Sequence, residues 1–250
     1  RSLLYVGNSR WQRGRLADAA DNFEVARQIF HAAGSAGGEA TALDHLGSVL
    51  LELGRLDEGK AHLQSAAAVY EAIGDSVGFG SAISNLAGVF ETEGNLEQSR
   101  ILRVQALKNF KAAGAASLEG IGHGNLAAVQ KKLGRLEAAS FNYQRAGDVL
   151  RRCGRAVEQA VFDAMFGQLL LVLGFVEAAA TNARQAGEAL DNLGTVNWRA
   201  QYVTPLEVRI DIERRNLRAA HDRLIALRRT AADGAEAAGV AAALKLCESL

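Results

Sequence analysis

Apolar residues recur along this chain at helical spacing, in segments that end at glycine. One segment ends near Leu53 and places four apolar residues on a single stripe of a helix, namely Leu43, Leu46, Val49 and Leu50. Gly54 follows it, as glycine often does just past a helix end. The next segment, "LDEGKAHLQSAAAVYEAIG", has the same spacing and ends at Gly74, after which Asp75 can cap a new helix. The pattern predicts two helices joined by a short turn.

This two-helix pattern repeats every forty residues. One glycine series comprises Gly14, Gly54, Gly94, Gly134 and Gly174. A second series comprises Gly34, Gly74, Gly114, Gly154, Gly194 and Gly234. A fixed period of this length indicates an array of structural repeats, and no segment shows the alternation and hairpin signals of strands. We therefore predict an all-α fold.

Three stretches of the chain resemble the tetratricopeptide repeat (TPR). They are "HLGSVLLELGRLDEGKAHLQSA", "NLAGVFETEGNLEQSRILRVQA" and "NLAAVQKKLGRLEAASFNYQRA". The matching features are a Leu-small pair, a Gly-x-Leu turn and a small residue five positions after that glycine, namely Ala19, Gly59, Ser99, Ala139 and Ala179. The forty-residue period is similar to the long TPR variant of kinesin light chains, Leu-Gly-Asn-type adaptors and bacterial signal-transduction ATPase regulators.

The resemblance implies a right-handed superhelix (an α-solenoid) of about six TPR hairpins with a C-terminal cap helix. We expect a single domain over residues 1–250, excised from a larger protein, with units at about 1–34, 35–74, 75–114, 115–154, 155–194 and 195–234 and the cap at 235–250. The sequence departs from the family where a bulky residue is usual, with Arg103 and Ala183 in that place. The sixth unit also shifts by one residue.

The stretch "LEGIGHGNLAAVQKKLGR" contains Gly120, Gly122 and Gly124, which could suggest a phosphate-binding loop. Such a loop requires a preceding strand, and the repeat instead places these glycines inside the first helix of the fourth unit. Glycine inside a helix costs about 1 kcal/mol relative to alanine. Either this helix begins late, near Gly124, or it is a flexible joint.

Composition narrows the function classes. The 28 basic and 28 acidic residues cancel, so we expect neither nucleic acid nor a membrane as partner. Cys153 and Cys247 lie far apart, and we interpret them as reduced thiols of a cytoplasmic protein. The histidines and cysteines lack the spacing of a zinc site, so we predict no metal and no cofactor.

The family resemblance implies that the first helix of each unit lines a concave groove. Helical spacing then selects the predicted groove residues, which are Tyr5, Asn8, Asp44, His45, Ser48, Glu52, Ser84, Asn85, Asn125, Lys132, Met165 and Gln168. Asn85 and Asn125 occupy the same place one repeat apart, and an amide can pair with any peptide backbone. The alternative is an asparagine that is solvated or bonded to a neighbouring helix.

Two further features have structural interpretations. His123 and Asp163 occupy equivalent places in neighbouring units, where a His–Asp pair could form, but no serine or cysteine nucleophile accompanies them. The sixth unit is rich in arginine, and interleaved acids such as Glu207 and Asp211 favour an ion-paired helix face over a nucleic-acid patch. We predict no catalytic residues.

These observations predict a non-catalytic interaction module. We expect it to bind a peptide or protein segment in its groove, as the partner-docking or regulatory arm of a multidomain protein. The alternative is a small-effector sensor domain of a bacterial transcriptional or signalling regulator.

Overall fold

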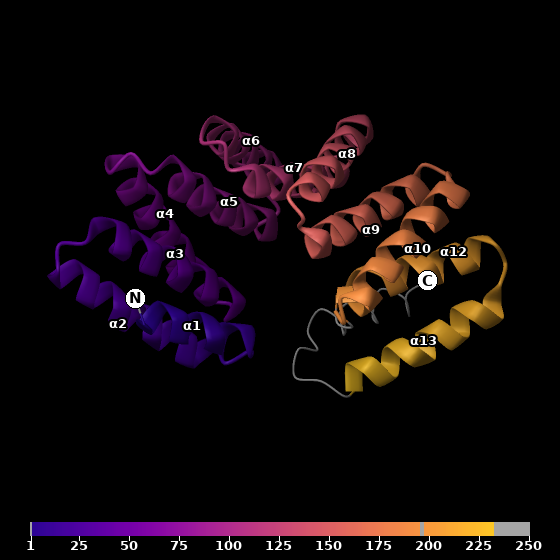
Figure 1. Cartoon of the computed structure of the whole chain (residues 1–250), viewed down its shortest axis with the longest axis horizontal. Helices are drawn as coiled ribbons and strands as arrows, with labels where there is room; N and C mark the ends of the chain where they lie inside the picture. Colours follow the sequence, from indigo (N-terminus) through magenta and orange to yellow (C-terminus); the bar gives the residue numbers. More distant parts are fainter. Residues whose placement is uncertain (1, 196–197, 233–250) are drawn as a thin grey trace. The chain divides into compact units, whose positions relative to one another are not determined.

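The computed structural model describes residues 2–195 and 198–232, and within them it contains helices and no strands. Helices follow one another in pairs joined by short turns (Figure 1). The pairs are α1 (Ser2–Gln12) with α2 (Leu16–Ala32), α3 (Ala36–Glu52) with α4 (Leu56–Ala72), α5 (Ser76–Thr92) with α6 (Leu96–Ala112), α7 (Ala116–Lys132) with α8 (Leu136–Arg152), α9 (Ala156–Val172) with α10 (Val176–Asn192), and α12 (Thr204–Glu213) with α13 (Leu217–Ala232). The all-α prediction is confirmed.

The chain divides into two compact units between Gly122 and His123, inside α7. We call them the N-terminal unit and the C-terminal unit and describe each by itself. The expectation of a single domain stays a prediction, and the expected cap helix at 235–250 lies outside the described residues.

Glycine ends the helices as the sequence predicts. Both glycine series have positive φ from Gly14 through Gly194, with values from 64° to 83°. At a representative end, the Gly74 amide donates to the Glu71 carbonyl at 3.1 Å and the Asp75 amide donates to the Tyr70 carbonyl at 2.9 Å. These two bonds form a Schellman motif, which satisfies carbonyls that the helix leaves open. Asp75 also caps α5, because its side chain accepts from the Gly78 amide at 2.8 Å.

In the N-terminal unit, second-helix side chains fill the core between hairpins. Phe23 on α2 and Leu63 on α4 are fully buried. The equivalent residue on α6 is Arg103, which forms a 2.8 Å ion pair with Glu91 on α5. The Arg103 and Glu91 side chains are only 11% and 16% exposed. An ion pair thus replaces the bulky apolar residue that the repeat pattern would place there.

In the C-terminal unit, the one-residue shift of the sixth repeat has a structural counterpart. A π-helical turn, η1 (Arg199–Val203), precedes α12. A π-helical turn contains more residues than an α-helical turn, so it can absorb an inserted residue. Downstream, Arg215 has a φ of 58° one position after the place where the glycine series would continue. Arg215 therefore occupies the left-handed position that glycine fills in the earlier turns.

The glycines of the fourth repeat lie inside α7, which runs without a break from Ala116 to Lys132. The phosphate-loop alternative is therefore excluded, and so is a helix that begins late. A Cβ on Gly124 would lie 2.3 Å from the Phe162 ring, and one on Gly122 would lie 3.3 Å from the Leu107 side chain. Gly124 allows the Phe162 ring on α9 to approach the α7 backbone. Whether α7 is a flexible joint stays a prediction.

Candidate binding surface on the first helices

The predicted groove residues all lie on the first helices of their pairs. Those of the N-terminal unit are on α1, α3 and α5, and those of the C-terminal unit are on α7 and α9. We call the predicted groove residues of each unit, taken together, its first-helix face.

Two predicted residues of the N-terminal unit form a direct contact. The Asn85 side chain on α5 donates from Nδ2 to Asp44 Oδ1 on α3 at 3.0 Å. Asp44 is buried, at 9% exposure, and Asn85 is partly buried. Burial raises the pKa of Asp44 to about 6, while the Asn85 hydrogen bond acts to lower it. This contact matches the alternative given for the asparagines, because Asn85 is bonded to a neighbouring helix. The fold therefore holds a poorly solvated carboxylate against a neutral amide.

Other predicted residues lie on the first helices of the same unit. Ser48 donates to the Asp44 backbone carbonyl at 2.9 Å, and Ser84 is partly buried on α5. Tyr5 is 76% exposed, Glu52 is exposed, and Asn8 is partly buried. These side chains offer hydroxyl, amide and carboxylate groups along the first helices of one unit.

His45 has a different environment from Asn85, although the two occupy equivalent repeat positions. Its ring stacks on Phe23 with centroids 5.1 Å apart and meets Trp11 edge-on at 6.1 Å. Burial lowers the pKa of His45, which favours the neutral ring. His45 is thus part of an aromatic cluster from α1, α2 and α3.

In the C-terminal unit, Asn125, Met165 and Gln168 are partly buried and Lys132 is exposed. Gln168 on α9 accepts a hydrogen bond from Lys131 Nζ on α7 at 3.4 Å. The sequence pattern did not single out Lys131. The only available signal was two consecutive lysines in the last turn of α7.

His123 and Asp163 contact different partners. His123 is buried, and its Nδ1 lies 2.7 Å from Asn142 Oδ1 on α8. The Asn142 amide in turn donates to Gln130 at 2.9 Å. Asp163 accepts from Gln159 on its own helix at 3.2 Å, and burial raises the pKa of its carboxyl. His123 therefore belongs to a buried polar network. This network fits a structural role for His123, and its burial excludes a simply exposed side chain.

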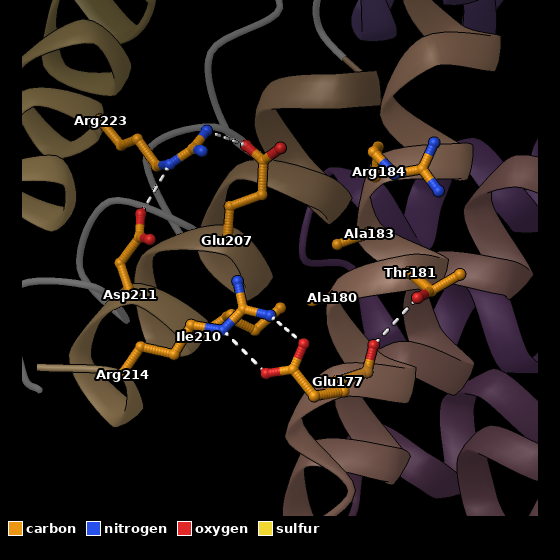
Figure 2. A pocket seen from close by; sticks show the side chains of 10 residues that line it. All are labelled: Glu177, Ala180, Thr181, Ala183, Arg184, Glu207, Ile210, Asp211, Arg214 and Arg223. Carbon is orange, nitrogen blue, oxygen red and sulfur yellow. Dashed lines mark hydrogen bonds and ion pairs between the residues drawn. The ribbon is translucent and has the colours of Figure 1, made fainter. Parts of the chain in front are cut away.

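A polar pocket of about 380 Å³, which the sequence did not predict, lies between α10 of the fifth hairpin and helices α12 and α13 of the sixth hairpin. Figure 2 shows Arg214 pointing at Glu177, and Arg223 pointing at Glu207 and Asp211. Arg214 pairs with Glu177 at 2.6 Å, and Arg223 pairs with Glu207 at 2.7 Å and Asp211 at 2.8 Å. The arginines of this hairpin thus include an ion-paired set, as the interleaved acids predicted.

Other kinds of site are not evident in residues 2–195 and 198–232. No cluster of three or more His, Cys, Asp or Glu side chains there could hold a metal ion. Cys153 is a free thiol, and Cys247 lies outside the described residues. No helix in these two ranges is both long enough and apolar enough to cross a membrane.

Comparisons with known proteins identify the fold. No protein-family model and no curated protein matches the sequence. Among solved structures, the apo form of RapI superposes with a TM-score of 0.72 and 12% identity, over 99% of this chain and 93% of that one. A Rap protein complexed with Competence and Sporulation Factor superposes with a TM-score of 0.73 and 12% identity, over 99% of this chain and 74% of that one.

A third similar structure is a signal transduction ATPase with numerous domains from Pyrococcus horikoshii, which has a tetratricopeptide repeat sensor. Its TM-score is 0.74 and its identity 14%, over 99% of this chain and 38% of that one. This chain thus spans well under half of that protein. These similarities show that the chain has the fold of TPR-like helical repeat proteins, as the sequence resemblance implied.

Proposed function

We propose that this chain is a non-catalytic interaction module that binds a peptide or protein segment along its first helices. The observation that carries the proposal is the Asp44–Asn85 contact. No described cation pairs with the buried Asp44 carboxylate. A buried charge without a counter-ion opposes folding, so its presence on the first-helix face suggests a role in binding.

The chemistry of these side chains suits an extended chain. Asn85 uses one amide N–H to contact Asp44, so its carbonyl oxygen and second N–H are available to a ligand. Asn125 forms no hydrogen bond with a described residue, so its entire amide is available. Amides that offer both a donor and an acceptor can pair with a peptide backbone whatever its sequence.

The second candidate is a sensor that binds a small effector for a signalling regulator. The similarity to the P. horikoshii ATPase favours it, because that protein has a tetratricopeptide repeat sensor. Both candidates place the ligand on the first helices and differ in the ligand's size. In either case, we propose that the chain is the docking or regulatory arm of a larger, cytoplasmic bacterial protein.

A random peptide library displayed on phage, selected on the full chain, tests the proposal. Selected peptides are synthesised, and their dissociation constants are measured by fluorescence anisotropy. We expect Asn125→Ala to weaken binding about threefold to tenfold, because a neutral hydrogen bond contributes about 0.5–1.5 kcal/mol. Its melting temperature should stay unchanged, because Asn125 has no described hydrogen-bond partner.

Asn85→Ala should weaken binding similarly but should also lower the melting temperature, because it removes the donor to buried Asp44. Arg218→Ala, at an exposed position of α13, is the control and should leave affinity unchanged. Selected peptides that respond to Arg218→Ala and ignore both asparagine changes would overturn the proposal.

A further inference from the structure

A further cavity of the C-terminal unit lies where α9 packs against α8 and α10. Its volume is about 320 Å³, which is within the range of small-molecule pockets. Asp148 and Arg151 line it from α8, Asp163 and Phe166 from α9, and Asn182 from α10. None of the predicted groove residues lines this cavity, so it is separate from the first-helix face. We call it the α9 cavity.

Asp163 brings a carboxylate into the α9 cavity without a cation bonded to it. Its Oδ2 accepts from the neutral Gln159 side chain at 3.2 Å, and it forms no ion pair within residues 2–195 and 198–232. Asp163 is partly buried, and burial raises the pKa of its carboxyl. A carboxylate that has lost hydration and has only a neutral partner is unfavourable in its charged form.

The basic side chains nearest to this carboxylate are engaged elsewhere. His123, its expected partner, contacts Asn142 instead. Arg151 lines the cavity but pairs with Asp148 at 3.3 Å, and both of these side chains are exposed. The charge of Arg151 lowers the pKa of Asp163 while the charge of Asp148 raises it, so the two oppose each other. The negative charge of Asp163 therefore remains largely uncompensated.

Gly147 on α8 gives the carboxylate its place in the cavity wall. A Cβ on Gly147 would lie 3.0 Å from Asp163 Oδ1, which is closer than an ordinary van der Waals contact. Glycine at this position therefore allows the carboxylate to lie against the α8 backbone. Both residues line the cavity, so the carboxylate is held where a ligand in the cavity can reach it.

The other lining groups suit an organic ammonium. Gln144, Asn182 and Gln185 line the cavity, and their side-chain carbonyl oxygens accept no hydrogen bond from a described residue. An ammonium has three N–H donors, which a carboxylate and amide oxygens can accept together. The Phe166 ring can contact either the cation or an aliphatic stem attached to it. The cavity thus combines a negative charge, neutral acceptors and an aromatic ring.

We propose that the α9 cavity binds a small organic cation through a primary ammonium group that pairs with Asp163. This inference goes beyond the proposed function, because it adds a second ligand at a site apart from the first-helix face. An ammonium would supply the counter-charge that the fold does not provide to Asp163. A free amine and the side chain of a partner's lysine share this chemistry, and the experiment separates them.

The test titrates n-butylammonium chloride, whose four-carbon stem matches that of lysine, into the ¹⁵N-labelled full chain at low salt. Dissociation constants come from NMR shifts of backbone amides. We expect Asp163→Asn to weaken binding at least about fivefold, because it removes the charge but keeps an acceptor for Gln159. Glu137→Gln, at an exposed position of α8, removes an equal charge outside the cavity and should have little effect.

Arg151→Gln provides a test in the opposite direction. It removes a competing positive charge from the cavity lining at an exposed position, so it should strengthen butylammonium binding without affecting folding. Nα-acetyl-lysine N-methylamide carries the same ammonium on a peptide backbone. If it binds with the same dependence on Asp163, the site accepts a partner's lysine, whereas binding of butylammonium alone indicates a free amine.

Four results would overturn the inference. These are absence of butylammonium binding, equal weakening by Asp163→Asn and Glu137→Gln, weaker binding in Arg151→Gln, and equally tight binding of sodium butyrate. Amide shifts should be concentrated on α8, α9 and α10, and shifts confined to other helices would also contradict it.

Discussion

Among single residues, Asp44 makes stability depend on pH. Its folded-state pKa of about 6 lies above the ordinary 3.8, so the folded state holds the proton more tightly. Stability from this group is therefore present at low pH and is lost as pH rises from about 4 to about 6. At neutral pH, the raised pKa of Asp44 therefore destabilises the folded state by about 3 kcal/mol.

Asp44→Asn tests this dependence. The variant should gain stability over the original chain as pH rises, from little difference near pH 4 to as much as about 3 kcal/mol at pH 7. Urea unfolding measured across this range reports the difference. A gap that stays constant with pH would show that the Asp44 carboxylate is not perturbed by burial.

The glycines of α7 should respond differently to alanine. Gly124→Ala should destabilise the chain by about 1–3 kcal/mol, because the new Cβ would overlap the Phe162 ring. Gly122→Ala has a 3.3 Å neighbour that can adjust, and its gain in helix propensity of about 1 kcal/mol should offset the contact. Thermal unfolding compares the two variants, and equal effects would contradict close packing at Gly124.

Arg215 adopts a backbone conformation that favours glycine. Arg215→Gly should stabilise the chain by about 1 kcal/mol, because a left-handed conformation costs a residue with a side chain about 1–2 kcal/mol. The reciprocal control is Gly174→Arg, at the equivalent turn with a φ of 83°, which should destabilise by a similar amount. A fall in melting temperature for Arg215→Gly would show that its side chain has a stabilising contact.

Among the helices, α6 is joined to α5 within one hairpin by the Arg103–Glu91 pair. Arg103→Leu should lower the free energy of unfolding by about 2 kcal/mol or more, because a partly buried Glu91 loses this partner. Adding Glu91→Gln should recover part of the loss by removing the charge. Chemical denaturation of the two single variants and the double variant measures the coupling, and strictly additive effects would contradict it.

For the molecule as a whole, the hairpins of the N-terminal unit have their own buried clusters. One such cluster joins α3, α4, α5 and α6 through residues including Ala66, Ile83 and Phe110. Because repeat arrays are stabilised by contacts between neighbours, residues 1–114 alone should remain largely helical by circular dichroism, with reduced stability. A fragment that is wholly unfolded would contradict this.

The repeat pattern was sufficient to predict the helical fold. Helix spacing, the turn glycines and the Asp75 cap depend on residues close together in the chain, so their signals are readable locally. The same reasoning located the one-residue shift of the sixth repeat, but the π-helical turn that precedes α12 was not evident from sequence. Choosing where a helix accommodates an extra residue depends on the packing around it.

Packing between helices determined which polar side chains meet. Asp44 and Asn85 are 41 residues apart, and Lys131 and Gln168 are 37 apart, so no local pattern specifies either contact. Equivalent repeat positions also acquire different environments, since Asn85 bonds to Asp44 while His45 stacks on Phe23. The helices and their turns could be read from the chain alone, because backbone preferences and apolar periodicity are local. Burial and charge at the candidate site depend on neighbours that are distant in the chain and meet only in the folded protein.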